Sequence, residues 1–191
     1  MVSVRYALVI GAQCVALGQL SFLPRLANEI HEILTDPLLG HCEAALFDVS
    51  GPLLNPTVEA MRDHLEEAFL RASEARASLF VAFIGHGRVA VEGPGQVGFD
   101  DYYLLPSDCP NPEQPRLRTA WRVGEELREL LRDHPDLDGL VFLIDACQSG
   151  QATVEVAARV ASIAAAAGAR FEVVAATDDR PAADGAVSPS R

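Results

Sequence analysis

The sequence predicts an α/β domain in which a mostly parallel central sheet carries helices on both faces. Short apolar runs alternate along the chain with longer segments whose apolar residues recur at helical spacing. The short runs are apolar throughout, which is typical of parallel strands buried between two layers of helices. A chain of 191 residues fits one domain with a single hydrophobic core.

The first half of the chain predicts two pairs of a strand and a helix. The apolar run YALVI at 6–10 is typical of a strand, and residues 20–34 carry apolar side chains at helical spacing. The run AALFD at 44–48 predicts a second strand. The next helix starts with Thr57 as its N-cap and continues to about residue 75. One face of this helix holds Val58, Met61, Leu65 and Phe69.

The second half of the chain continues the alternation. The run SLFVAFI at 78–84 predicts a third strand, and the Gly- and Pro-rich residues 88–119 predict a hairpin and a long loop. The further predicted elements are a helix at 122–133, a strand at 140–145, an Ala-rich helix at 153–167 and a strand at 171–176. We assign residues 1–177 to the domain and residues 178–191 to a flexible tail.

Composition restricts the possible functions. The chain has 27 acidic against 15 basic residues and a net charge of -12, which disfavours nucleic-acid binding. No apolar run is long enough to span a membrane and no secretory signal is recognisable, so we expect a cytoplasmic protein without a membrane partner.

The cysteines and histidines lack metal-ligand spacing, so we expect no metal, no cofactor and no disulfide. Apart from Cys147, we expect the cysteines to be core or loop thiols. Four histidines are expected to face solvent: His31, His41, His64 and His134.

Two of the predicted strands run into residues that can carry nucleophilic chemistry. The third strand leads into Gly85-His86-Gly87, and the fourth leads into Asp145-Ala146-Cys147. Because reactive groups gather beyond the carboxyl ends of parallel strands, we expect His86 and Cys147 to meet at one edge of the sheet. A nearby imidazole raises the thiolate fraction of a cysteine and later protonates the leaving amine. The backbone N–H groups of Gly87 and Cys147 are candidates for an oxyanion hole.

These motifs, G-H-G after one apolar strand and D-A-C-Q-S-G after another, resemble the caspase and metacaspase superfamily of cysteine peptidases, most closely the prokaryotic caspase homologues. The opening ALVIG strand and the DDYYLLPSD stretch support the resemblance. It implies the caspase-haemoglobinase fold, a dyad of His86 and Cys147, and an oxyanion hole that includes Gly87. In the family a small subunit follows the large one, so residues 178–191 are expected to lead toward a small-subunit fragment of the same precursor.

The resemblance also predicts the substrate, a protein or peptide with Arg or Lys at the cleavage site. Caspases, which cut after Asp, carry Gln two positions before the nucleophile, whereas metacaspases carry Asp there and cut after Arg or Lys. This chain has Asp145, on the same side of an extended strand as Cys147 and able to pair with a guanidinium. Asp178 or Asp179 is a candidate second carboxylate. Ile84 replaces the pocket serine that metacaspases place two residues before the histidine.

Two further expectations concern regulation. Many metacaspases bind calcium through four acidic residues, and Asp100 and Asp101 resemble one pair of them. Another of the four acidic residues would be needed seven residues after Cys147, but Val154 occupies that position. We therefore expect no strict calcium requirement. The last residue, Arg191, is a candidate site of self-processing for a peptidase that cuts after basic residues. A chain boundary unrelated to processing is an equal alternative.

The alternative to an active peptidase is a catalytically silent, caspase-like scaffold or regulatory module. A lone Cys or His at the end of a buried strand is more often structural than catalytic. The joint placement of His86 and Cys147 favours catalysis, because a decayed active site usually loses one of its two reactive residues.

Overall fold

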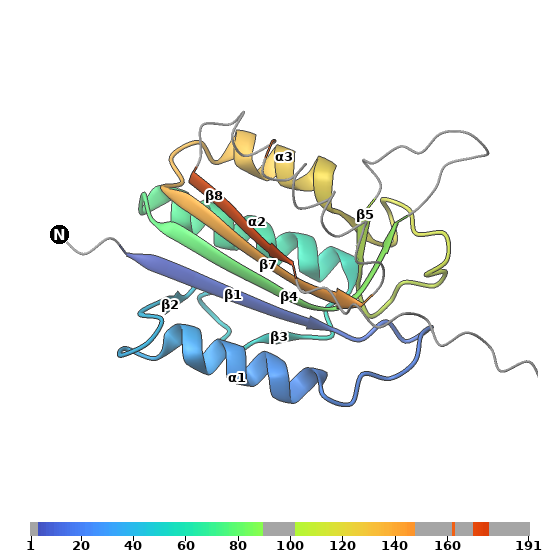
Figure 1. Ribbon diagram of the computed structural model, residues 1–191. Coiled ribbons are helices and arrows are strands. Elements are labelled where there is room, and N and C mark those ends of the chain that lie inside the picture. The colour runs from blue at the N-terminus through green and yellow to red at the C-terminus, as the bar shows by residue number, and fades with distance from the viewer. Residues whose placement is uncertain (1–3, 90–101, 148–161, 163–169, 176–191) are drawn as a thin grey trace, which may run out of the picture.

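The computed structural model describes residues 4–89, 102–147, 162 and 170–175, which form an eight-stranded sheet with three helices (Figure 1). The strands are β1 (Arg5–Ala12), β2 (Glu43–Ala44), β3 (Leu53–Leu54), β4 (Ser78–Val89), β5 (Tyr102–Leu105), β6 (Trp121–Arg122), β7 (Gly139–Cys147) and β8 (Arg170–Ala175). The helices are α1 (Leu23–Thr35), α2 (Val58–Glu74) and α3 (Val123–Asp133).

The central strands of the sheet are parallel. β4 pairs in parallel with β1 on one side and with β7 on the other, and β8 pairs in parallel with β7. The two-residue strands β2 and β3 both pair in parallel with β1. β5 pairs in antiparallel direction with the carboxyl-terminal part of β4, and β6 pairs in antiparallel direction with β5, so the sheet is mixed. The predicted fold class, α/β with a mostly parallel central sheet, is confirmed.

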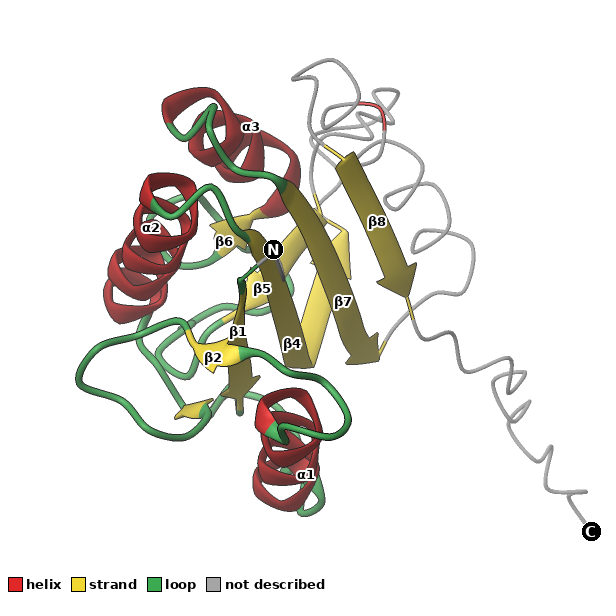
Figure 2. Cartoon of the chain, turned by 90° about the vertical axis from the view of Figure 1, so that its left-hand side faces the viewer, coloured by secondary structure: helices red, strands yellow, loops and turns green. Residues whose placement is uncertain are grey.

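Helices cover both faces of this sheet, with α1 on one face and α2 and α3 on the other (Figure 1 and Figure 2). Successive residues of β4 point alternately to the two layers. Leu79, Val81 and Phe83 pack in the core beneath α2 and α3, whereas Ala82 and Ile84 pack with α1. The two-residue repeat of a strand produces this alternation, and burial of both faces explains why the run SLFVAFI is apolar throughout.

Helix α2 begins and packs as the sequence predicts. Thr57 is its N-cap, and the face predicted to be apolar is buried over its whole length. Arg71 in the last turn donates hydrogen bonds to the carbonyl oxygens of Ala44 and Ala45 and stacks on the ring of Phe47. The helix is therefore tied both to the core and to the edge of the sheet beside β2.

Thr57→Ala is expected to lower the free energy of unfolding by about 1 kcal/mol, because the Thr57 hydroxyl accepts the backbone N–H of Ala60 at 3.2 Å. Thr57→Ser keeps this acceptor and is expected to lose much less. Urea unfolding followed by circular dichroism measures both changes. Equal losses in the two variants would contradict the assignment of the hydroxyl as the cap.

Two strand boundaries differ from the prediction. The strand expected at 44–48 is reduced to β2, and the Arg71 side chain binds the carbonyl oxygens of Ala44 at its end and of Ala45 just after it. The third predicted strand does not stop before its reactive residues, since β4 continues through His86 to Val89. β5 pairs with this extension on one side and β7 on the other, and the two partners hold it extended. The predicted hairpin is present as the β4–β5 pair.

Two of the histidines expected to face solvent are buried, so that expectation was wrong. His31 is 9% exposed and its Nε2 lies 3.1 Å from the carbonyl oxygen of Ser50. His134 is 6% exposed and its Nε2 lies 3.0 Å from a carboxylate oxygen of Glu66 on α2. In both cases a segment distant in the sequence covers the ring. Three cysteines are buried free thiols, as predicted: Cys14, Cys42 and Cys109.

Several predictions concern residues that the structure does not describe. The helix at 153–167, apart from residue 162, and the tail at 178–191 lie outside the described residues. The same holds for Asp100, Asp101 and Val154. None of the helices that the structure does describe is long and apolar enough to cross a membrane.

Candidate active site

The pairing of β4 with β7 brings the predicted reactive residues together. The register runs from Ser78 opposite Gly139 to His86 opposite Cys147, at the carboxyl-terminal ends of the two parallel strands. Neighbouring strands lie about 4.8 Å apart, so the backbones of His86 and Cys147 are direct neighbours. Residues far apart in the sequence thus meet at one edge of the sheet.

The His86 ring is held from the loop that follows β1. The ring is half-buried, and its Nε2 lies 3.2 Å from the carbonyl oxygen of Gly18. A carbonyl oxygen can only accept a hydrogen bond, so this contact requires a proton on Nε2. In a neutral imidazole the other nitrogen, Nδ1, then carries the lone pair and is the atom that can take up a proton.

Asp145 lies two residues before Cys147 on β7, opposite Ile84 of β4. Its side chain is half-buried, and burial raises the pKa of its carboxyl group above the ordinary value. No neighbouring charge among the described residues offsets this effect of burial. A cation placed beside Asp145 would therefore favour its ionised form. Ile84 is buried in the core on the α1 side, which explains how an apolar side chain is accommodated at this position.

Gly87 is buried in β4 between two elements of the site. A Cβ built on Gly87 would collide with the hydroxyl oxygen of Tyr102 on β5 and would approach the Cβ of Ala146 to 3.1 Å. Glycine at this position therefore lets β5 and β7 pack closely against the strand that carries His86. The remaining predicted site residues, Asp178, Asp179 and Arg191, lie outside the described residues.

Comparison with protein families gives a match that agrees with the α/β fold. The family profile of the caspase domain matches residues 4–189, nearly the whole chain. The chain belongs to the caspase domain family. Membership indicates a cysteine peptidase, and a peptidase domain implies protein substrates. Among curated proteins, none matches the chain.

Sequence reasoning missed the part of this caspase domain that contacts the catalytic histidine candidate. The carbonyl of Gly18 contributes through its backbone, and a Cβ built on Gly18 would meet no heavy atom within 4 Å. Neither the identity of the residue nor its surroundings marks it as a functional position. Only the path of the loop between β1 and α1 reveals the contact.

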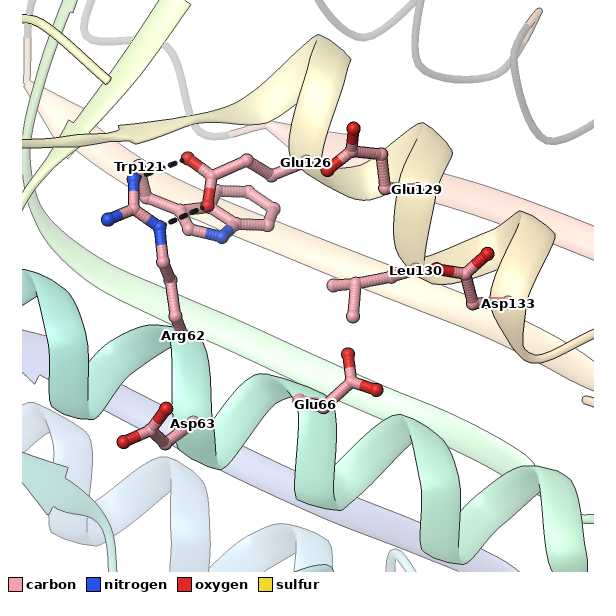
Figure 3. Close-up of a pocket in the computed structure, with 8 residues that line it drawn as sticks. All are labelled: Arg62, Asp63, Glu66, Trp121, Glu126, Glu129, Leu130 and Asp133. Atoms are coloured by element: carbon pink, nitrogen blue, oxygen red, sulfur yellow. Dashed lines mark hydrogen bonds and ion pairs between the residues drawn. The ribbon is translucent and has the colours of Figure 1, made fainter. Parts of the chain in front are cut away.

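The caspase domain also has a pocket of about 310 Å³ between α2 and α3, and none of the predicted site residues lines it (Figure 3). Five carboxylates line it, together with Arg62, Trp121 and Leu130. Arg62 on α2 donates to both carboxylate oxygens of Glu126 on α3, at 2.6 and 2.9 Å. This ion pair joins the two helices. Among the described residues, no group of three or more His, Cys, Asp or Glu side chains is placed to hold a metal ion.

Proposed function

We propose that this caspase domain is a cysteine endopeptidase of the metacaspase type that cleaves proteins after Arg or Lys. Cys147 is the nucleophile and His86 the general base, and together they form the catalytic dyad. The observation that carries the proposal is the register of β4 and β7, which sets His86 opposite Cys147. The motifs around His86 and Cys147 resemble those of the prokaryotic caspase homologues.

The reaction proceeds through a thioester on Cys147. His86 takes the thiol proton on Nδ1, and the thiolate attacks the carbonyl carbon of the scissile peptide bond. The protonated imidazole then gives its proton to the leaving amine as the C–N bond breaks. Water, deprotonated by the same imidazole, hydrolyses the thioester and restores the thiol. The backbone N–H groups of Gly87 and Cys147 stabilise the oxyanion that forms in each half of the reaction.

The contact with Gly18 supports this assignment of the base. Because the Gly18 carbonyl binds Nε2–H, the imidazolium that forms during the reaction keeps a hydrogen-bond acceptor on that side. A positive charge on the ring is thereby stabilised by a backbone carbonyl. The described residues thus supply a base that is both oriented and able to carry the proton.

Asp145 sets the preference for a basic residue at the cleavage site. Its half-buried carboxylate lies on β7 two residues before the nucleophile, and burial makes its ionised form costly until a cation arrives. A substrate guanidinium supplies that cation and can form two parallel hydrogen bonds with the carboxylate. Asp178 and Asp179 are candidates for a second carboxylate that binds the basic side chain of the substrate.

A peptide-based alkylating reagent with Arg at the cleavage position is expected to modify one thiol per chain, on Cys147. Cys14, Cys42 and Cys109 are buried, and burial raises the pKa of Cys42 and Cys109, so little of either thiol is ionised at neutral pH. Intact mass spectrometry with peptide mapping measures the number and position of labels.

The matched control for this labelling experiment is Cys147→Ser, which should remain unlabelled. Labelling of a buried cysteine in place of Cys147 would contradict the proposed nucleophile. A wild-type chain that is folded and takes up no label at all would favour the silent scaffold over the peptidase.

A further inference from the structure

The loop between β1 and α1 presents the carbonyl that contacts His86, and packing does not fix this carbonyl. Gly18 is exposed, and no heavy atom lies near the position of its absent side chain. Within the loop, the backbone hydrogen bond from Leu17 N–H to the Cys14 carbonyl closes one turn. That bond does not involve the peptide group that faces His86. Another contact has to hold the Gly18 carbonyl in place.

The side chain of Gln13 makes this contact and uses both ends of its amide. Its Nε2 donates to the Gly18 carbonyl oxygen at 3.0 Å, and its Oε1 accepts the backbone N–H of Leu20 at 2.6 Å. The amide therefore bridges two backbone groups two residues apart, much as a neighbouring strand would. The result is that the peptide between residues 18 and 19 has a fixed orientation.

Gln13 is itself anchored to the sheet. It directly follows β1, and its backbone N–H donates to the side-chain oxygen of Asn55 at 3.0 Å. Asn55 in turn donates its backbone N–H to the carbonyl oxygen of Gly11 in β1 at 2.7 Å. The chain of contacts from β1 through Gln13 to the Gly18 carbonyl is continuous. The position of that carbonyl is therefore fixed relative to the sheet that carries His86.

We propose that Gln13 is a positioning residue for His86. By holding the Gly18 carbonyl against Nε2, it fixes both the orientation of the imidazole and the tautomer with its proton on Nε2. The two lone pairs of the Gly18 oxygen accept one N–H from Gln13 and one from His86. The inference rests on the proposed function, because it assigns Nδ1 of His86 as the base of the peptidase.

Loss of this support would affect the chemical step more than substrate binding. Without Gln13 the carbonyl is free to turn away, and the neutral ring can then exchange its proton between the two nitrogens. Only the tautomer with its proton on Nε2 has a free Nδ1 that can accept the thiol proton. A poorly oriented imidazole also slows proton transfer. The expected signature is a lower kcat with little change in KM.

The test compares Gln13→Met and Gln13→Glu with wild type. Gln13→Met has a similar length but neither donates nor accepts, and it is expected to lower kcat about tenfold while KM stays within about twofold. Nitrogen-15 NMR of the histidine side chains should show one His86 tautomer in wild type and a mixture in Gln13→Met. Hydrogen exchange of the Leu20 amide should become faster, because its acceptor is gone.

Gln13→Glu keeps the acceptor for Leu20 and replaces the donor by a carboxylate. A carboxylate cannot donate to the Gly18 carbonyl, so this carbonyl loses its support and nitrogen-15 NMR should again show a mixture of His86 tautomers. Gln114→Glu, on an exposed loop residue, makes the same change in net charge and should keep the single His86 tautomer of wild type.

The outcomes separate this inference from the proposed function. A wild-type tautomer of His86 in Gln13→Met overturns the positioning role, whether or not kcat changes, and wild-type kcat in that variant does the same. Tautomer mixing in Gln13→Met in a chain whose wild type cleaves no peptide supports the positioning role and instead contradicts the peptidase. If Gln13→Met fails to fold, the tautomer of His86 in Gln13→Glu decides, and a single wild-type tautomer there counts against the inference.

Discussion

Cys147→Ala and His86→Ala are each expected to lower kcat for cleavage of an Arg-containing peptide by roughly 10⁴-fold or more while both chains stay folded. The thiolate and its base act as a unit, so removal of either one abolishes the covalent route. For the same reason the double variant should lose little more than either single variant. Cleavage of a fluorogenic peptide measures the rates, and circular dichroism with thermal melting checks the fold.

His64→Ala is the matched control for the histidine variant. His64 is half-buried on α2, where its ring nitrogen contacts the Ala60 carbonyl of its own helix, so its loss should leave kcat near the wild-type value. Substantial cleavage by Cys147→Ala would refute Cys147 as the nucleophile. An additive loss in the double variant would contradict the view that the two residues work together in one step.

Asp145→Asn is expected to lower kcat/KM for Arg substrates by about 100-fold, since the amide keeps the shape of the carboxylate but cannot neutralise a guanidinium. Alkylation of Cys147 by a small neutral reagent such as iodoacetamide should change by less than about twofold, because that reaction needs no basic side chain. The contrast between the two assays separates substrate recognition from reactivity of the thiol. Equal losses in both assays, or wild-type cleavage after Asp, would contradict the proposed specificity.

The same substitution should stabilise the fold at neutral pH. Burial raises the pKa of Asp145 in the folded chain above its unfolded value, so folding disfavours the ionised carboxylate. The associated stability is present below the unfolded pKa and is lost as the pH rises through the folded pKa. Asp145→Asn, which cannot ionise, is therefore expected to melt at a higher temperature than wild type at pH 7 and at the same temperature near pH 3.

An activity that requires ionised Asp145 should also have an acidic limit. As the pH falls through the raised pKa, the carboxylate is protonated and loses its attraction for the substrate guanidinium. A bound Arg substrate opposes this protonation, so the limit should lie at lower pH for kcat than for kcat/KM. The profile of Asp145→Asn should lack this limit. If Asp145→Asn keeps the acidic limit of wild type, the protonation of another group causes that limit.

The apolar runs of the sequence were sufficient to predict the layered α/β fold. The run SLFVAFI is apolar on both sides because helices cover both faces of β4. Its composition alone therefore predicts burial of both faces. The helix beginning at Thr57 was equally clear, because a capping residue and a repeating apolar face are both local signals. Local patterns predicted these elements because their cause is local.

The motifs around His86 and Cys147 predicted which residues meet, since parallel strands end at a common edge. Their exact pairing could not be predicted from the same information. The sequence placed His86 and Cys147 beyond the ends of their predicted strands, whereas β4 continues to Val89 and β7 includes Cys147. The backbone there stays extended because β5 and β7 supply hydrogen-bonding partners that are distant in the sequence.

By itself the sequence determined the class of the sheet, the helix that starts at Thr57 and the meeting of the candidate residues His86 and Cys147 at the strand ends. Only the tertiary structure decided that His31 and His134 are buried and that Gln13 holds the Gly18 carbonyl against His86. The physical reason is the range of the interactions. Periodicity and capping act between residues within a few positions of each other, whereas the contacts of a backbone carbonyl or of a covered ring depend on how distant segments cross.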